Sequence, residues 1–245
     1  MSVRRTLRVV WAAISVAVVE SALIGLAAAA PLLLLQVLGR TTSGPVRVGA
    51  LLVALGPAYL VFALCLMVFS ALAMRTLGWR TPPGATLRIA DAEWPLLDWA
   101  RGLAATHVVR LLAGAVLRAT PIWSMYVRLN GARVGRRVFI NSLQLMDHNQ
   151  LELGDGVVIG SAAHLSGHTV EHGLLKTGSV RLDHNVTIGV GSVIGIDVVI
   201  GAGTQVGALS LVPKHSRLPE GAVYAGIPVQ RLDAHRDRRL AFVTT

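Results

Sequence analysis

Three of the eight histidines lie within nine residues, at His164, His168 and His172, and Glu171 stands directly before the last of them. An imidazole titrates near neutral pH, so it can take a proton from a hydroxyl or amine group that attacks an acyl carbonyl. A carboxylate such as Glu171 can orient that imidazole or support its charge. The segment therefore indicates general-base chemistry, and solvated loop histidines without a catalytic role are the alternative.

The sequence around these histidines has an aliphatic side chain at about every sixth position, followed by a small or turn-forming residue. A period of six fits neither an amphipathic helix nor one long alternating strand. It fits short strands that each point one aliphatic side chain inward and then bend, so that three strands close a triangular coil and coils stack by parallel pairing. A generic glycine-rich β domain is the alternative. The predicted inward positions are Val134, Ile140, Met146, Leu153, Ile159, Leu165, Leu182, Ile188, Ile194, Ile200, Val206 and Val212.

Two steps depart from this period. The step from Met146 to Leu153 is one residue longer than six, which predicts a bulge. The step from Leu165 to Leu182 is one residue shorter than three six-residue repeats, and it contains the histidine segment. Because function concentrates on loops that a rigid scaffold positions, we predict that this coil carries a functional loop.

The first 80 residues hold most of the apolar excess of a chain with 53% hydrophobic residues and a mean hydropathy of +0.60. Val9–Leu38 contains Glu20 as its one charged residue, and Val48–Met74 contains none. Both stretches exceed the ~20 residues that cross a bilayer. Residues 1–80 are therefore predicted to form a transmembrane helical hairpin. A secretory signal peptide, with Arg4, Arg5 and Arg8 as its basic start, is the alternative.

The arginines flank the predicted spans, and their distribution slightly favours both termini on the cytoplasmic side of the cell membrane. The β domain is then predicted to be cytoplasmic. The net charge of +10 indicates contact with anionic membrane lipid. A nucleic-acid partner is not expected, because the arginines do not form a patch with stacking aromatic residues.

Residues 81–130 are predicted to be a linker and a third helix over Pro95–Leu117. With tryptophans nearby, a polar stripe on this helix suits an interfacial amphipathic helix in the headgroup layer. Packing of the stripe against the end of the β domain is the alternative. The stripe consists of His107, Arg110, Gly114 and Arg118. Residues 233–245 are predicted to be a charged tail.

The six-residue period, the histidine loop and the endings Val212–Gly221 and Tyr224–Pro228 together resemble the hexapeptide-repeat acyltransferases. The resemblance implies a left-handed parallel β-helix over residues 131–232, a homotrimer, and acyl-CoA such as acetyl-CoA bound between neighbouring coils. It also implies that the histidine following the start of the loop is the general base. The implied roles are His168 as the base, Lys214 and Arg217 at the CoA phosphates, and Ala225 and Gly226 beside the pantetheine arm.

Nearly the whole chain is also similar to a membrane–coil repeat from the C-terminal region of poly-lysine-synthetase-type nonribosomal peptide synthetases. The similarity rests on the hairpin, the linker Arg80–Gly84, the pair Thr120–Pro121 and the segment Arg128–Gly135 ahead of the coils. It implies a carrier-bound phosphopantetheine thioester as a possible donor and an adenylation or carrier protein as a possible partner. The implied roles are an amide-forming, peptide-releasing domain or a non-catalytic, trimerising terminal module.

Zinc-dependent carbonic anhydrases share the coil fold and bind their metal through histidines. His164, His168, His172 and His184 invite this comparison, but their spacing does not match the pattern of that family. No metal is therefore expected. The favoured prediction is a membrane-anchored acyltransferase that acylates a hydroxyl or amine from a CoA or carrier thioester.

Overall fold

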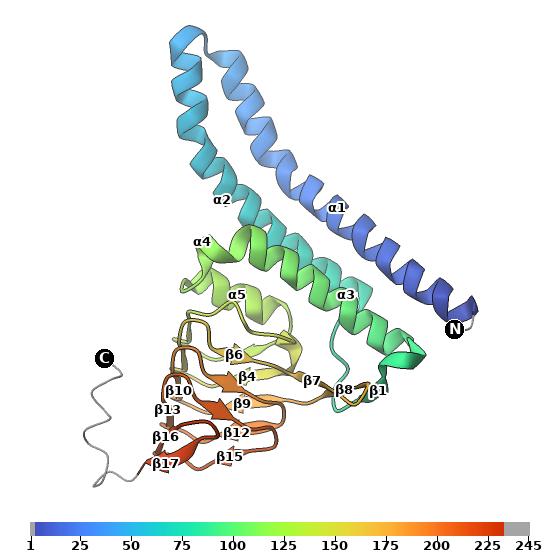
Figure 1. Cartoon of the computed structure of the whole chain (residues 1–245). Helices are drawn as coiled ribbons and strands as arrows, with labels where there is room; N and C mark the ends of the chain where they lie inside the picture. The colour runs from blue at the N-terminus through green and yellow to red at the C-terminus, as the bar shows by residue number, and fades with distance from the viewer. Residues whose placement is uncertain (1–2, 233–245) are drawn as a thin grey trace.

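The computed structural model describes residues 3–232, so the predicted charged tail lies outside the described residues. A long helical hairpin extends from one end of a β-helix, and a third helix lies between the two (Figure 1). The hairpin consists of α1 (Val3–Thr41) and α2 (Gly44–Leu77), which pack side by side. The helix α2 ends at Leu77, and the left-handed backbone of the following Gly78 (φ 71°) directs the N–H of Trp79 to Met74 O at 3.1 Å.

Three helices of the described chain are long and apolar enough to cross a membrane. The helices α1 and α2 have mean hydropathies of 2.1 and 2.5 over their most apolar windows, as the predicted hairpin requires. The third, Trp94–Leu117, has a mean hydropathy of 1.3 and is the most buried of the three within the protein. It consists of α3 (Trp94–Val109), a π-helical turn η2 (Arg110–Gly114) and α4 (Ala115–Leu117).

The polar stripe of this third helix packs in part against the β-helix. The Arg110 guanidinium donates to Leu143 O at 3.4 Å. A Cβ on Gly114 would lie 2.9 Å from Cδ2 of Leu143, so the helix packs closely on this coil at Gly114. This part of the stripe therefore follows the second alternative, packing on the end of the β domain. The short helix α5 (Pro121–Leu129), capped by Thr120, adds the buried Trp123 to the same end.

Three parallel sheets form the faces of the β-helix. The first face comprises β2 (Arg133–Val134), β4 (Leu151–Leu153), β9 (Val180–Leu182), β12 (Val198–Ile200) and β15 (Arg217–Leu218). The second comprises β3 (Phe139–Ile140), β5 (Val158–Ile159), β10 (Thr187–Ile188), β13 (Gln205–Val206) and β16 (Val223–Ala225), with β17 (Gln230–Leu232) antiparallel at its edge. The third comprises β6 (His164–Leu165), β11 (Val193–Ile194) and β14 (Leu211–Val212).

Aliphatic side chains from each face stack in register toward a common core. On the second face Ile159 pairs with Ile188, which pairs with Val206, and all three are buried. Burial of each such side chain stabilises the fold by roughly 1.5–3 kcal/mol. The corners leave little room, since a Cβ on Gly160 would lie 2.7 Å from Val190 N. The predicted fold class, an apolar helical hairpin followed by a parallel β-helix, is confirmed.

One inward position differs from the prediction. Leu145, rather than Met146, is buried and bridges Leu165 on the third face. The predicted bulge is a 3-10 turn, η3 (His148–Gln150), and Asp147 before it has a left-handed backbone with φ 54°. The turn takes up more residues than a simple bulge, so the preceding inward position moves back by one.

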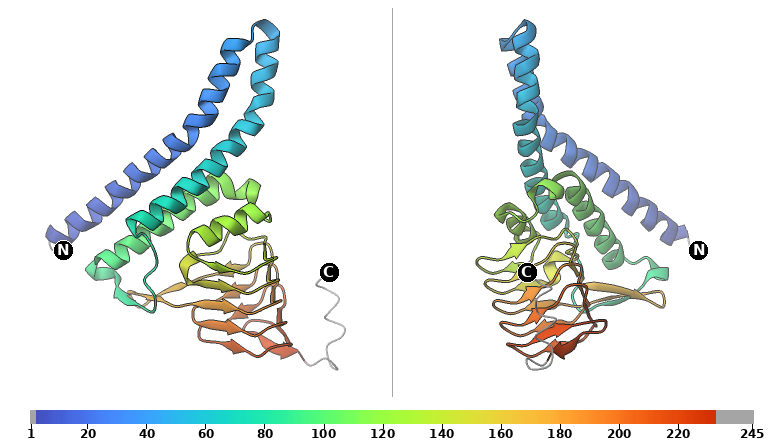
Figure 2. Two further views of the ribbon diagram at one scale, coloured as in Figure 1. Left: turned by 180° about the vertical axis from the view of Figure 1, so that it is seen from behind. Right: turned by 60° about the vertical axis from the view of Figure 1, so that its left-hand side comes forward.

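The second irregularity is a hairpin that projects from one coil, as the sequence predicts. It consists of β7 (His168–Glu171) and β8 (Leu174–Thr177). The linker strand β1 (Thr86–Arg88) pairs with β8, and the turn η1 (Ile89–Asp91) then leads to α3. Figure 2 shows the hairpin extending out of the β-helix toward the N-terminal end of α3. Linker and loop therefore form one small sheet beside the coils.

Candidate active site

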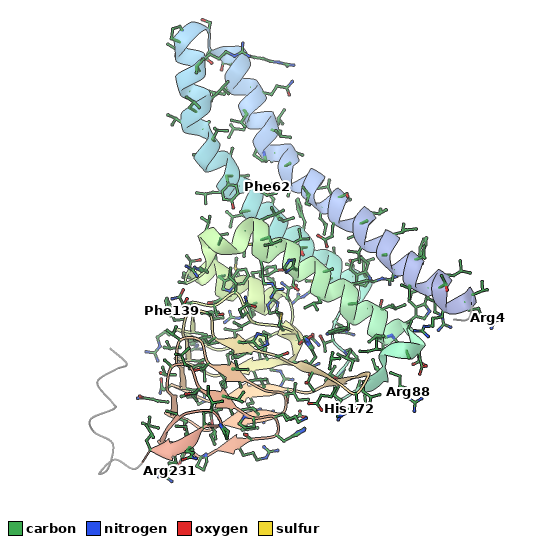
Figure 3. All side chains as sticks on the ribbon, viewed as in Figure 1. Arg4, Phe62, Arg88, Phe139, His172 and Arg231 are labelled. Carbon is green, nitrogen blue, oxygen red and sulfur yellow. The ribbon has the colours of Figure 1, made fainter. Side chains whose placement is uncertain are left out.

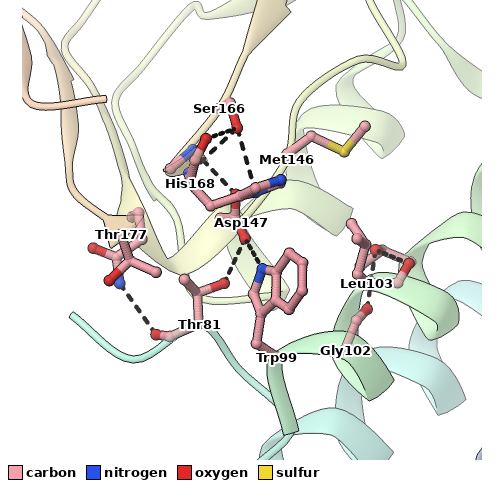
Figure 4. Close-up of polar contacts among 12 residues, drawn as sticks. Thr81, Trp99, Gly102, Leu103, Met146, Asp147, Ser166, His168 and Thr177 are labelled. Carbon is pink, nitrogen blue, oxygen red and sulfur yellow. Dashed lines mark hydrogen bonds and ion pairs between the residues drawn. The ribbon is translucent and has the colours of Figure 1, made fainter. Parts of the chain in front are cut away.

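His168 lies at the start of the projecting hairpin and contacts the carboxylate of Asp147 (Figure 4). Its Nδ1 is 2.5 Å from Asp147 Oδ2. The Asp147 side chain is 2% exposed and the His168 side chain 19% exposed, so solvent reaches the imidazole far more than the carboxylate. Asp147 was missed from the sequence as a functional residue. Its signal was the irregular step that contains it, which we interpreted as a bulge.

The Asp147 carboxylate has four hydrogen-bond partners, which come from three separate segments. Oδ1 accepts from Thr81 Oγ1 at 2.6 Å and from Trp99 Nε1 at 3.0 Å. Oδ2 accepts from the backbone N–H of Gly167 at 3.1 Å, in addition to His168. Burial alone raises the pKa of Asp147, but the hydrogen bonds and charge of His168, with those from Thr81 and Trp99, outweigh it and lower the pKa. Asp147 is therefore a carboxylate at neutral pH.

This arrangement determines which nitrogen of His168 is available for chemistry. Because Asp147 is an ionised acceptor, Nδ1 carries a hydrogen, and in the neutral imidazole the lone pair is then on Nε2. Among the hydrogen bonds of residues 3–232, none engages Nε2. The indole of Trp99 meets the imidazole edge-to-face, with ring centroids 5.0 Å apart. A neutral imidazole with a free Nε2, oriented by a carboxylate, is the arrangement that general-base catalysis requires.

The segments that precede the β-helix supply two of the groups that donate hydrogen bonds to Asp147. Thr81 comes from the linker after α2, and Trp99 comes from α3. The linker is tied to the β-helix, since Asn149 Nδ2 and Gln150 Nε2 donate to Thr81 O at 2.8 and 3.1 Å. The site therefore spans the boundary between the helices and the coils.

Glu171 does not contact His168, contrary to the role that the sequence suggested. His168 and Glu171 are three residues apart on β7, so their side chains point to opposite faces of the sheet. The Glu171 carboxylate instead pairs with Lys214 and, at 3.6 Å, with Lys176. The ion pair with Lys214 lowers the pKa of Glu171. These contacts tie the hairpin to the end of the coils. Asp147 occupies the orienting position that we expected for Glu171.

The residues expected at coenzyme A lie at the far end of the β-helix. Lys214 follows β14 and is paired with Glu171. Arg217 is exposed on β15 of the first face. Ala225 ends β16 on the second face, and the exposed Gly226 (φ 108°) follows it. The described chain does not gather these four residues around a single cavity, and their roles stay predictions.

The remaining histidines lie in different surroundings. His164 on β6 is half-buried, and burial followed by the charges of His168 and Arg110 lowers its pKa. His172 is exposed at the hairpin tip near Arg88 (Figure 3). The exposed His184 accepts from Asp155 N at 3.1 Å. Within residues 3–232, no three His, Cys, Asp or Glu side chains are placed to hold a metal ion.

A cavity of about 970 Å³ lies beside Asp147, between the helices and the β-helix. Its walls come from the end of α2, the linker, α3 and the turn after Asp147. His148 lies in this wall, is 4% exposed, and has no hydrogen-bond partner for either ring nitrogen. Burial, reinforced by the charge of Arg110, lowers the pKa of His148 to about 4. His148 is therefore neutral at pH 7.

Because of this pKa shift, we predict that His148 lowers the stability of the folded protein in mild acid. Below pH 6.5 the unfolded chain binds a proton at His148, whereas the folded chain binds it only near pH 4. The free energy of unfolding therefore decreases as the pH falls through this window. The free energy of unfolding should fall by up to roughly 3 kcal/mol from this residue. We expect thermal unfolding midpoints of the His148→Gln variant to fall less between pH 7 and pH 4 than those of the wild type. The exposed His184→Gln variant is the control. An equal decrease of the unfolding midpoint with pH in all three proteins would contradict the prediction.

No family model matches the chain. The delta-poly-L-ornithine synthetase of Acinetobacter baumannii (strain AB307-0294) is 28% identical over 148 residues, which is 60% of this chain. The match covers 11% of the synthetase, so the chain spans about a tenth of the length of this relative.

Solved structures with similar coordinates include acetyltransferases. The hexapeptide-repeat containing acetyltransferase VCA0836 from Vibrio cholerae is 24% identical, with a TM-score of 0.39 over 42% of this chain and 62% of that chain. A galactoside acetyltransferase in complex with coenzyme A is 22% identical, with a TM-score of 0.35 over 49% of this chain and 72% of that chain. Hexapeptide-repeat acyltransferases are therefore among the structural neighbours, and the sequence match is a distant, partial one to a synthetase.

Proposed function

We propose that the protein is a membrane-anchored acyltransferase in which His168 is the general base and Asp147 holds it in the reactive tautomer. The observation that carries this proposal is the hydrogen bond of 2.5 Å between His168 Nδ1 and the buried Asp147 carboxylate. That bond leaves Nε2 as the basic nitrogen on a side chain that solvent can reach. The resemblance of the repeats and the histidine loop to hexapeptide-repeat acyltransferases supports the same reaction class.

In the proposed reaction a hydroxyl or amine group attacks the carbonyl carbon of a thioester. Nε2 of His168 takes the proton of the attacking group as the new C–O or C–N bond forms. The carbon–sulfur bond then breaks, and the imidazolium returns the proton to the departing thiolate, which leaves as a free thiol. Asp147 stabilises the imidazolium without taking its proton. No covalent intermediate on the protein is needed.

The proposed donor is an acyl-CoA, such as acetyl-CoA, or a phosphopantetheine thioester on a carrier protein. The structures of the Vibrio cholerae acetyltransferase and of the galactoside acetyltransferase include complexes with acetyl coenzyme A and coenzyme A, respectively. In this proposal Lys214 and Arg217 contact the phosphates, and Ala225 and Gly226 border the pantetheine arm. The β-helix associates as a trimer, so that the donor lies between neighbouring copies. A carrier or adenylation protein is the proposed partner when the donor is carrier-bound.

A second candidate function is amide formation that extends or releases a peptide. It is favoured by the 28% identity to a delta-poly-L-ornithine synthetase over 60% of the chain. The same base would deprotonate an amine acceptor, and the donor would be an aminoacyl thioester. In both functions we propose that α1 and α2 cross the cell membrane with the β-helix on the cytoplasmic side.

Donor binding tests the proposed function. Full-length protein in detergent should unfold at a higher temperature with acetyl-CoA, because a ligand at 100 times its Kd adds about 2.7 kcal/mol to the free energy of unfolding. Addition of an amine or hydroxyl acceptor should then release free thiol, measured with a thiol-reactive dye. Stabilisation and thiol release with an aminoacyl-carrier thioester alone would favour amide formation. Absence of both effects with either donor would overturn the acyltransferase and leave a non-catalytic assembly module.

A further inference from the structure

The cavity beside Asp147 contains buried polar atoms that have no hydrogen-bond partner among residues 3–232. Both ring nitrogens of His148 are unpartnered, and so is Oδ1 of Asn130, which also lines the cavity. A buried polar group without a hydrogen bond costs roughly 1–3 kcal/mol. A neutral imidazole offers one donor and one acceptor, and the amide oxygen offers an acceptor. The inner wall is therefore suited to a ligand that carries hydroxyl or similar uncharged polar groups.

Two arginines line the same cavity without an acidic partner. Arg75 lies in the last turn of α2, Arg80 lies in the linker, and both are exposed. No ion pair within residues 3–232 involves either of them. The carboxylates in the wall are already engaged, since Asp98 pairs with Arg101 at 2.9 Å and Asp147 is bonded to His168. The two free guanidinium groups therefore favour an anionic group, for which phosphate has matching geometry.

The remaining wall is apolar and comes largely from helices that could cross a membrane. Met74 on α2 and Leu103 on α3 lie in the lining, together with Trp79 from the linker and Trp99 from α3. The linker adds Pro82 to this surface. Because α2 and the helix Trp94–Leu117, which begins with α3, both meet the length and hydropathy required of a membrane span, a molecule with acyl chains can reach the cavity from the bilayer. Tryptophan side chains favour this interfacial depth.

We propose that this cavity binds a phosphate-bearing amphiphile from the membrane, with its phosphate between Arg75 and Arg80. Its headgroup hydroxyls face His148 and Asn130, and its chains lie along Met74 and Leu103. The site is separate from Nε2 of His168, because Asp147 forms the cavity wall and binds the opposite nitrogen, Nδ1. The inference rests on the membrane location in the proposed function and does not require acyl transfer.

The probe is dioctanoyl phosphatidylglycerol, which combines short acyl chains, a phosphate and hydroxyl groups. Native mass spectrometry of the full chain released from detergent should detect one bound molecule per chain at saturation. Dioctanoylglycerol, which lacks the phosphate, and inorganic phosphate, which lacks the chains, should each bind at least about tenfold more weakly. Equal binding of either comparison molecule would overturn the proposal.

Variants separate this site from general attraction between a basic protein and an anionic lipid. The double variant Arg75→Gln/Arg80→Gln should weaken binding about tenfold or more, because each arginine near an anionic lipid contributes severalfold to affinity. The control Arg40→Gln/Arg47→Gln removes the same charge from the other end of the hairpin and should change binding less than twofold. Equal losses of lipid affinity in the two double variants would mean that arginine charge attracts the lipid without a specific site, which contradicts the proposal.

His148 tests the inner wall of the cavity. His148→Leu should weaken binding about fivefold, whereas His148→Gln, which can still donate and accept, should stay within about twofold of the wild type. Circular dichroism establishes that each variant is folded. Unchanged binding in His148→Leu would overturn the assigned headgroup position. Since none of these measurements uses a thioester, failure of the acyltransferase function and failure of this site are distinguishable.

Discussion

The His168→Ala variant is expected to lower the rate of acyl transfer about 10³-fold, within the range that a general base contributes. In the proposed reaction Nε2 takes the proton of the attacking hydroxyl or amine, and the alanine variant leaves only solvent water as the base. His168 begins an edge hairpin and its side chain is not part of the coil core, so the β-helix should stay folded. The measurement is thiol release from the thioester donor with saturating acceptor.

The matched control for this variant is His184→Ala, which removes an exposed imidazole from a coil corner. It should keep activity within about twofold of the wild type. His164→Ala removes the half-buried neighbour of His168 and tests whether a second imidazole is the base. Activity within tenfold of the wild type in His168→Ala, or a larger loss in His164→Ala, would rule out the assigned base.

Asp147→Asn is the second substitution with a large expected effect, a loss of about 10³-fold in activity. An asparagine amide can present its N–H₂ to His168 Nδ1, which favours the tautomer with the hydrogen on Nε2. The variant therefore removes the basic lone pair from Nε2 while leaving the imidazole in place. The readout is again thiol release, with thermal unfolding to verify that the protein is folded. Activity close to that of the wild type would show that Asp147 has no part in orienting the base.

The two side chains that donate hydrogen bonds to Asp147 Oδ1 allow the same test with smaller expected effects. Thr81→Val and Trp99→Phe each remove one hydrogen bond to a charged group, so each should lower activity about tenfold. Each should also raise the pKa of Asp147, because the lost donor stabilised the carboxylate. With fewer donors the carboxylate accepts more strongly from His168 Nδ1–H and favours the protonated base, so the acid limb of the pH–rate profile should move to higher pH. A purely structural role would lower activity without moving that limb. Glu171→Gln, on the same hairpin but paired with lysines, should leave the limb unchanged.

The base candidate was predictable because local sequence carries its signal. His168 lies where a coil is interrupted, and an interruption of a strict six-residue period can be read from the chain alone. The orienting carboxylate was assigned wrongly, since proximity in sequence favoured Glu171. On a strand, however, residues three apart face opposite sides, and an ion pair with Lys214 holds Glu171 at the coil end. Asp147 lies 21 residues before His168, one coil earlier.

The helical hairpin and the parallel β-helix could be predicted from the sequence, because both depend on local patterns: long apolar stretches for one, and an aliphatic residue at every sixth position for the other. The meeting of Thr81, Trp99 and Asp147 at His168 is visible only in the folded chain. These contacts join the linker, a helix and two successive coils, and no repeat or spacing along the chain encodes such a convergence. The same packing of helices on coils also creates the cavity beside Asp147, so the helices help to build the site.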